Sequence, residues 1–172
     1  MGTKNRNVMI CAVDTDQGSD ACSWFVDQVY REGDVVHLVY VARTLKPPME
    51  VFHGLPGTAY SFKQPGSHHE METIEHTRAV IEARYVPILK RKNVKYHMHM
   101  YAVNVDASNA NIAEIIQKAA TEEIKPDLLL LTTHNRPVDT QRDHDCVGGV
   151  TSSLIKNCRL PLVIIPPTDA IC

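Results

Sequence analysis

Residues 128–136 have the sequence LLLLTTHNR, in which an apolar run passes directly into a polar one. The four leucines form a run of strand length without alternation, which is typical of a strand buried on both faces of a parallel sheet. The polar half, Thr132 to Arg136, begins where that strand ends. Ligands of open parallel sheets bind beyond the carboxyl ends of the strands, so the polar half is a candidate binding loop.

Similar apolar runs recur on both sides of this stretch, separated by segments whose apolar residues repeat at helical spacing. Strands alternating with helices indicate a parallel sheet with both faces covered and right-handed crossovers. We therefore expect a doubly wound, five-stranded parallel sheet in a three-layer α/β/α sandwich. The predicted strands are 8–13, 35–41, 94–103, 128–131 and 162–165, and the predicted helices lie around 21–29, 74–92, 112–120 and 150–158. Gly33 is predicted to end the first helix, and two prolines close the last strand.

The length of 172 residues predicts one domain, 1–172, with a long loop at about 43–67 and a second loop at about 134–147. A net charge of −2 argues against a partner that is a nucleic acid or an anionic membrane. No apolar run approaches the roughly 20 residues that span a bilayer. Five cysteines without CxxC spacing indicate reduced thiols, and the first residues lack the apolar core of a secretory signal. We expect a cytoplasmic protein.

Two features lie where the predicted sheet would bind a ligand. Asp14 ends the first strand and can accept hydrogen bonds from a base or a ribose; it can equally be a turn or helix-capping aspartate. Gly148 and Gly149 precede the last helix, whose free N–H groups favour an anion, with the hydroxyls of Thr151 to Ser153 as further donors. The alternative is a loop hinge followed by a capping hydroxyl.

No metal centre, catalytic residue or redox cofactor is predicted. His134, Asp143, His144, Asp145 and Cys146 share one loop, but their spacing fits no recognised metal site. His97 and His99 lie on one face of a predicted strand, where half-solvated histidines are ordinary. The sequence contains no GxSxG, GxxxxGK[ST], GxGxxG or HExxH motif.

With this order of elements, the chain resembles the universal stress protein family over nearly its whole length. The resemblance is carried by VMICAVDTDQGSDACSWFV, by DVVHLVYV, and by DLLLLTTHNR followed by GGVTSSLIKNCRLPLVIIPP. It implies the adenine nucleotide alpha hydrolase-like fold with strand order 3-2-1-4-5. It also implies a stress-response or regulatory role, with ATP or AMP as ligand, with or without Mg²⁺, and at most weak ATP hydrolysis.

Family members that bind ATP usually have the motif Gly-x2-Gly-x9-Gly-Ser/Thr. The resemblance places Thr132 and Asn135 at the first two glycines and Gly148-Gly149 at the Gly-Ser/Thr pair. Twelve residues, 136–147, stand where the motif has nine. The chain therefore departs from the motif at three positions, and side-chain donors such as Thr133, His134 and Arg136 would have to replace the lost backbone freedom.

The resemblance implies a binding site and a dimer contact. Residues next to the adenine and ribose would be Ala12, Val13, Asp14, Val41 and Leu131. Residues next to the phosphates would be Thr132, Thr133, His134, Asn135, Arg136, Gly148, Gly149, Val150 and Thr151. The homodimer would form through the last strand, Leu162 to Ile165, whose apolar edge favours pairing.

Three other functions fit parts of the sequence. The closest alternative is a dimeric interaction protein of the same family that binds no nucleotide. The Asp-x-Asp at Asp14 and Asp16 also ends a strand in haloacid-dehalogenase-like phosphatases, but Gly18 stands where those enzymes have a larger aliphatic residue. A phospho-receiver domain would have a lysine where Pro166 and Pro167 follow the fifth strand.

Overall fold

The computed structural model describes residues 5–44, 66–133 and 147–166. Within these ranges five parallel strands form one sheet in the order β3-β2-β1-β4-β5. The predicted parallel sheet and its strand order are confirmed. The strands are β1 (Asn7–Cys11), β2 (Val35–Thr44), β3 (Lys95–Asn104), β4 (Leu128–Thr132) and β5 (Leu162–Ile165). The helices are α1 (Asp16–Gln28), α2 (Gly66–Lys90), α3 (Asn109–Lys118), the π-helical η1 (Ala119–Ile124) and α4 (Gly149–Asn157).

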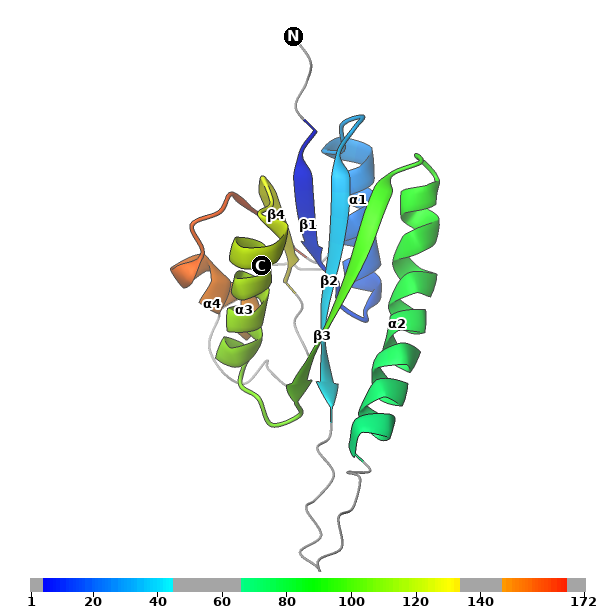
Figure 1. Ribbon diagram of the computed structural model, residues 1–172. Helices are drawn as coiled ribbons and strands as arrows, with labels where there is room; N and C mark the ends of the chain where they lie inside the picture. The colour runs from blue at the N-terminus through cyan, green and yellow to red at the C-terminus, as the bar shows by residue number, and fades with distance from the viewer. Residues whose placement is uncertain (1–4, 45–65, 134–146, 167–172) are drawn as a thin grey trace, which may run out of the picture.

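The helices form a layer on each side of the sheet, as Figure 1 shows: α1 and α2 cover one face, and α3 and α4 the other. Alternate residues of each central strand therefore enter different cores. Val8 and Ile10 of β1 pack with α1 and α2, whereas Met9 and Cys11 pack with α3, η1 and α4. The continuous apolar runs of the sequence follow from this burial on both faces.

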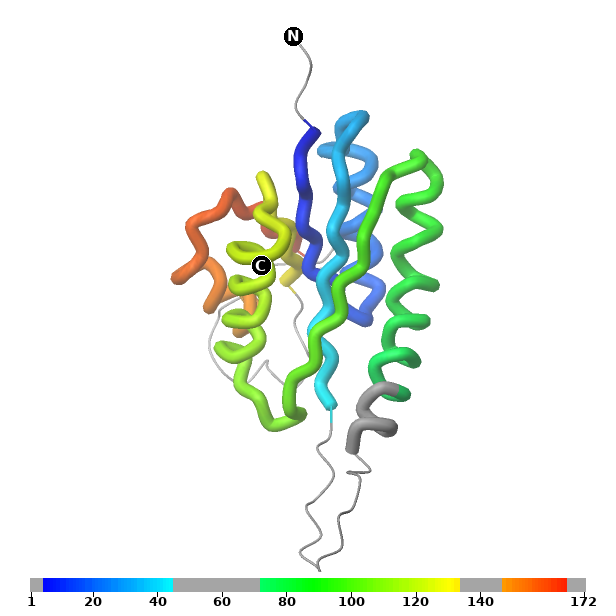
Figure 2. Tube along the Cα trace, in the orientation of Figure 1, coloured from blue at the N-terminus to red at the C-terminus, as the bar shows by residue number. Residues whose placement is uncertain are grey.

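The ends of β1, β2 and α2 differ from the sequence prediction. β1 ends at Cys11, whereas β2 continues to Thr44 and pairs with β3 over its whole length. The Thr44 hydroxyl donates to the Val103 carbonyl at 3.3 Å, which ties the far end of the two strands together. Figure 2 shows β2 and β3 continuing past the end of β1. Because β2 runs to Thr44 and α2 begins at Gly66, both ends of the loop predicted at 43–67 belong to these elements, and residues 45–65 lie outside the described residues.

The first helix ends earlier than predicted, and Gly33 does not end it. Thr15 caps the start of α1 by accepting from the Gly18 N–H at 3.4 Å. At the other end, the N–H groups of Val29 and Tyr30 both bond to the Phe25 carbonyl, which closes the helix without a glycine. Gly33 instead has φ +94° in the turn before β2, a conformation that few other residues adopt.

The third predicted helix is longer than its apolar stripe indicates. It starts at a capping box between Ser108 and Asn111 and passes from α3 into η1. It ends where Lys125 adopts a left-handed conformation and its N–H bonds to the Ala120 carbonyl. A π-helical turn has no sequence pattern of its own, so periodicity did not predict it.

The outer surfaces of the molecule contain two free strand edges and one exposed tryptophan. Among the described residues β3 and β5 each pair with one strand only, and all four residues of β5 are partly exposed. Trp24, on α1, is 42% exposed. None of the helices in the described ranges is both long and apolar enough to span a membrane.

Candidate functional site

The exit of β1 is held by a tyrosine from α2. The Tyr85 hydroxyl accepts from the Val13 N–H and donates to the Val13 carbonyl, both at 3.0 Å. Burial raises the pKa of Tyr85 above its usual range, so the hydroxyl keeps its proton. A side chain on Gly18 would overlap both Tyr85 and Val13, which explains a glycine in the first turn of α1. Tyr85 therefore bonds both the N–H and the carbonyl of Val13, and Ala12 beside it is buried.

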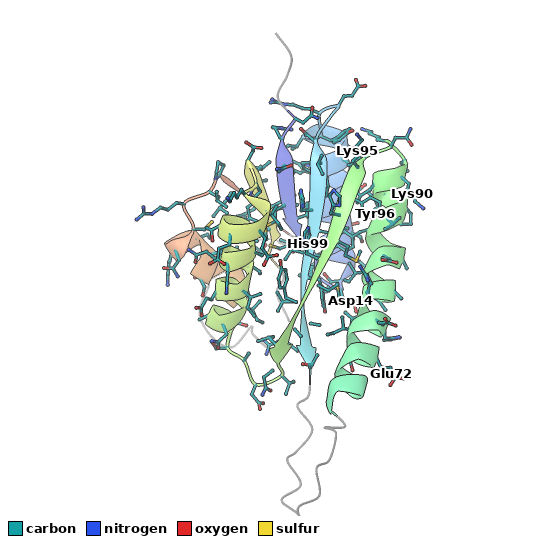
Figure 3. The ribbon with its side chains drawn as sticks, viewed as in Figure 1. Asp14, Glu72, Lys90, Lys95, Tyr96 and His99 are labelled. Carbon is teal, nitrogen blue, oxygen red and sulfur yellow. The ribbon has the colours of Figure 1, made fainter. Side chains whose placement is uncertain are left out.

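Asp14 is bound by an arginine of α2. The Arg84 guanidinium donates through Nε to Asp14 Oδ1 at 2.9 Å and through an Nη to Asp16 Oδ1 at 2.5 Å. The Asp14 side chain is 45% exposed, and Figure 3 shows it between the sheet and α2. Both acids of the Asp-x-Asp stretch thus share one cation. The hydrogen bond to Asp16, and then the charges of both acids, raise the pKa of Arg84 above its usual value.

The sequence predicted that the second strand ends at Val41. The strand instead continues to Thr44, and Val41 lies beyond the point where β1 ends. The last bond between the two strands runs from the Ala12 N–H to the Val39 carbonyl at 2.8 Å. After Val39, β2 is paired only with β3. Val41 is partly buried and packs against the core under α3. It therefore borders the point where β1 leaves the sheet.

The end of β4 is buried and bonded to its neighbours. Leu131, Thr132 and Thr133 are each less than 8% exposed. The Thr133 N–H donates to the Ile165 carbonyl at 3.1 Å, which extends the pairing with β5. Thr132 Oγ1 is the exception: it is buried and has no hydrogen-bond partner among the described residues. Such an orphaned hydroxyl is costly, because its hydrogen bonds to water are not replaced.

The start of α4 lies directly against the end of β4. The Thr151 hydroxyl donates to the Thr132 carbonyl at 3.3 Å, so this hydroxyl faces the sheet. Gly148 is the N-cap residue, and no side chain in the described part of the chain caps the helix. A side chain on Gly149 would overlap Asn109 at the start of α3, so the two helix starts are in close contact. Val150 is partly buried and packs into the core below.

The site can thus be traced to three neighbouring segments at one edge of the sheet. The structure brings together the end of β4 and the start of α4, and it places the end of β1 beside β4. Sequence reasoning missed Arg84, Tyr85 and Asn109, because each reaches the site from a helix distant in sequence. A tyrosine on the apolar stripe of α2 was the only signal available for Tyr85.

Some of the predicted site residues lie outside the described part of the chain. These are His134, Asn135 and Arg136, together with the other loop residues considered as metal ligands, Asp143, His144, Asp145 and Cys146. In the described ranges, no group of three or more histidine, cysteine or carboxylate side chains is arranged to hold a metal ion.

Solved structures with the same order of strands and helices are similar to this chain over nearly their whole length. A member of the universal stress protein family from Burkholderia pseudomallei has 19% identity and a TM-score of 0.57, covering 92% of this chain and 95% of its own. Universal stress protein UspA from Lactobacillus plantarum has 12% identity and a TM-score of 0.62, covering 95% and 99%. The chain has the universal stress protein fold.

A third protein of this fold was solved with a ligand. It is a universal stress protein family protein from Arabidopsis thaliana with AMP bound, at 12% identity and a TM-score of 0.53, covering 95% of this chain and 93% of its own. No family model and no curated protein matches the chain. At these identities the likeness establishes the universal stress protein fold, and the chemistry has to be argued from the site.

Proposed function

We propose that the protein binds an adenine nucleotide at the carboxyl edge of the sheet, between the end of β1, the end of β4 and the start of α4. The observation that carries the proposal is the start of α4, which no described side chain caps, lying against a buried hydroxyl, Thr132 Oγ1, that has no partner within the described ranges. A helix start presents free N–H groups and a positive dipole end, which suit a phosphate. The fold supports the adenine part, since the Arabidopsis thaliana protein of the same fold has AMP bound.

Different residues would contact the phosphate, the base and the ribose of the nucleotide. Gly148 to Val150 present backbone N–H groups to the phosphate. Val41, which is partly exposed, offers apolar surface to the base, with the buried Leu131 in the core behind it. Asp14 Oδ2, the oxygen that Arg84 does not bond, accepts from a ribose hydroxyl. Thr151 supports the site from behind rather than donating to the phosphate, because its hydroxyl is bonded to Thr132.

The finer parts of this proposal follow the resemblance described above. The nucleotide is ATP or AMP, with Mg²⁺ bound through the phosphates when ATP is the ligand. The role is regulatory, in a stress response and in the cytoplasm. His134, Asn135 and Arg136 complete the phosphate side. Hydrolysis, if present, is weak, because both acids near the end of β1 are paired with Arg84 rather than free to attack a phosphate.

Thr132→Val tests the proposal with two readouts. Valine has nearly the same shape without the hydroxyl, so it removes the orphaned group. We expect the free energy of unfolding of the empty protein to rise by about 1 kcal/mol, measured by urea denaturation. We expect the affinity for AMP to fall by about fivefold to tenfold, measured by calorimetry, because the bound nucleotide loses a donor.

Thr151→Val is the matched control. Its hydroxyl is already bonded to the Thr132 carbonyl, so its removal should lower stability by about 1 kcal/mol. Adenosine is the control ligand, since it lacks the phosphate and should bind more weakly than AMP. A wild-type protein that binds neither AMP nor ATP, with or without Mg²⁺, at millimolar concentration would contradict the proposed function.

The second candidate function is a dimeric interaction protein that binds no nucleotide. The observation in its favour is the free edge of β5, where each of the four residues is partly exposed. We propose a homodimer through Leu162 to Ile165 in either case. The two functions are separated by the AMP titration, and the dimer is tested on its own below.

A further inference from the structure

The two helices on the α3 side of the sheet begin next to each other, and one side chain lies between their starts. Because all five strands are parallel, α3 and α4 both begin at the carboxyl edge, where the nucleotide is proposed to bind. Figure 1 shows both helices on the same face of the sheet. Asn109 is the first residue of α3, and Gly149 is the first residue of α4. Both are exposed, so a ligand from solution can reach them.

The side-chain amide of Asn109 lies where a side chain on Gly149 would begin. A Cβ atom on Gly149 would overlap Asn109 Nδ2 and would stand only 3.1 Å from its Cγ. The amide nitrogen therefore fills the space beside the first turn of α4. The NH2 group of an asparagine is a donor only. It adds a side-chain donor to the free backbone N–H groups that every helix start presents.

An arginine of β2 orients this amide. Arg43 donates through Nη1 to the carbonyls of Val105 and Ala107, both at 2.8 Å, and through Nη2 to Asn109 Oδ1 at 3.5 Å. A guanidinium has donors only, so the amide oxygen faces Arg43 and the NH2 group faces Gly149. All three acceptors are neutral, so the guanidinium keeps its positive charge. That charge polarises the amide and makes its NH2 group a stronger donor.

We propose that Asn109 donates a hydrogen bond from Nδ2 to the phosphate of the bound nucleotide, and that Arg43 positions this amide. The inference rests on the proposed function and adds a donor from α3 to the phosphate side of the site. Among the described residues no side chain caps α4, and Thr132 Oγ1, buried at the end of β4, has no partner. The phosphate thus receives backbone N–H groups, one hydroxyl and the Asn109 amide. Arg43 acts through the amide and is a positioning residue.

Asn109→Asp tests the proposal, because aspartate has the same shape but a carboxylate oxygen in place of the NH2 group. Aspartate also suits the first turn of α3 and can pair with Arg43, so the start of the helix is kept. We expect the affinity for AMP in calorimetry to fall by about tenfold or more, because a donor to the phosphate becomes a like charge. The affinity for adenosine, which has no phosphate, should stay within about twofold.

Gln117→Ala is the matched control. Gln117 also joins α3 to α4 with its side-chain amide, since Nε2 donates to the Asn157 carbonyl at 3.2 Å, but it does so at the far end of the two helices. Its loss should leave both affinities unchanged. Equal AMP affinity in the wild type, Asn109→Asp and Gln117→Ala would overturn the inference and leave the proposed function in place. A wild-type protein that binds neither AMP nor adenosine would overturn both.

The positioning role of Arg43 is tested by combining two substitutions. Arg43→Met removes the guanidinium, and we expect the affinity for AMP to fall about threefold to fivefold, with adenosine unchanged. In the Asn109→Ala protein, the same substitution should change the AMP affinity by less than about twofold, because the amide that it positions is gone. Equal losses in the two backgrounds would show that Arg43 acts on the phosphate by its charge, and they would overturn the positioning role.

A second measurement does not depend on the affinity of any variant. The side-chain amides of asparagine and glutamine give signals in a nitrogen–proton NMR spectrum, and the Asn109 signals are those missing from the Asn109→Asp protein. In the wild type, AMP should shift these signals and adenosine should not, while the signals of Gln117 stay in place. Asn109 signals that saturating AMP leaves unmoved would overturn the inference.

Discussion

At the scale of single residues, the same aspartate can have a structural and a binding role. Arg84 bonds one oxygen each of Asp14 and Asp16, yet only Asp14 directly follows the buried exit of β1. The sequence identified Asp14 because an acid after an apolar run marks a strand end. It could not identify Arg84, because the two partners are 70 positions apart and no pattern in the sequence pairs them.

The two aspartates provide a test with an internal control. Asp14→Ala removes the proposed acceptor for the ribose, so we expect the affinity for both AMP and adenosine to fall about tenfold in calorimetry. Asp16→Ala removes the other partner of Arg84 and should leave both affinities within about twofold. Equal losses in the two variants would indicate that the charge of the pair matters and that Asp14 makes no contact with the sugar.

At the scale of elements, the pattern of apolar residues predicted every strand, while strand ends were less predictable. Runs such as Leu128 to Leu131 are buried on both faces, and that burial is what the pattern records. The end of β2 is set instead by its pairing with β3 out to Thr44, a contact between distant segments. The π-helical η1 and the position of Gly33 in a turn rest on backbone geometry, which hydrophobic spacing does not encode.

The free edge of β5 allows a test that spares the core. The carbonyls of Pro161 and Ile165 both accept from β4, so the backbone of Ile164, between them, points to the free edge. Ile164→Pro removes the edge donor while the bonds to β4 remain. We expect the proposed dimer to dissociate to monomer in analytical ultracentrifugation.

Ile164→Val is the control for this experiment, because it trims the side chain and keeps the N–H group. It should sediment as the wild type does. A wild-type protein that is monomeric at tens of micromolar, or an Ile164→Pro protein that still forms the dimer, would contradict pairing through β5.

At the scale of the whole molecule, the fold was more predictable than the site. Parallel pairing and the two helix layers follow from the alternation of elements, the strand order follows from the family resemblance, and all three are confirmed. The site depends on side chains that meet from distant helices, as Tyr85 does at Val13, and on 134–146, which lie outside the described residues. That residues 1–172 form one domain stays a prediction.

His37, whose ring lies 5.3 Å from those of His97 and His99, is expected to make the stability of the whole molecule depend on pH. The pKa of His37 is about 4 in the folded protein and about 6.5 in the unfolded chain, so the unfolded chain binds more protons between these values. The free energy of unfolding should therefore be highest above pH 6.5 and fall as the pH drops toward 4. Lys95 lies on the same strand as His97 and His99, and Glu123 of η1 bonds Tyr101 and lies near His99.

Urea denaturation at several pH values measures this effect. His37→Gln should flatten the curve between pH 6.5 and 4, because glutamine does not titrate. His76→Gln, on the exposed side of α2, should keep the wild-type slope. Parallel curves for the wild type and the His37→Gln protein would show that another group causes the loss.

The division of β1 between the two helix layers has a chemical consequence. Cys11 lies in the core under α3 and α4, and Cys22 lies in the core under α1 and α2. Burial raises the pKa of each thiol to about 12, so neither reacts with an alkylating reagent until its own layer opens. Each half of the interior thus contains a buried thiol whose alkylation reports the opening of that half. Mass spectrometry would measure the rate at which each cysteine is alkylated, and that rate gives the opening frequency of its half. Equal rates would mean that the two halves open together.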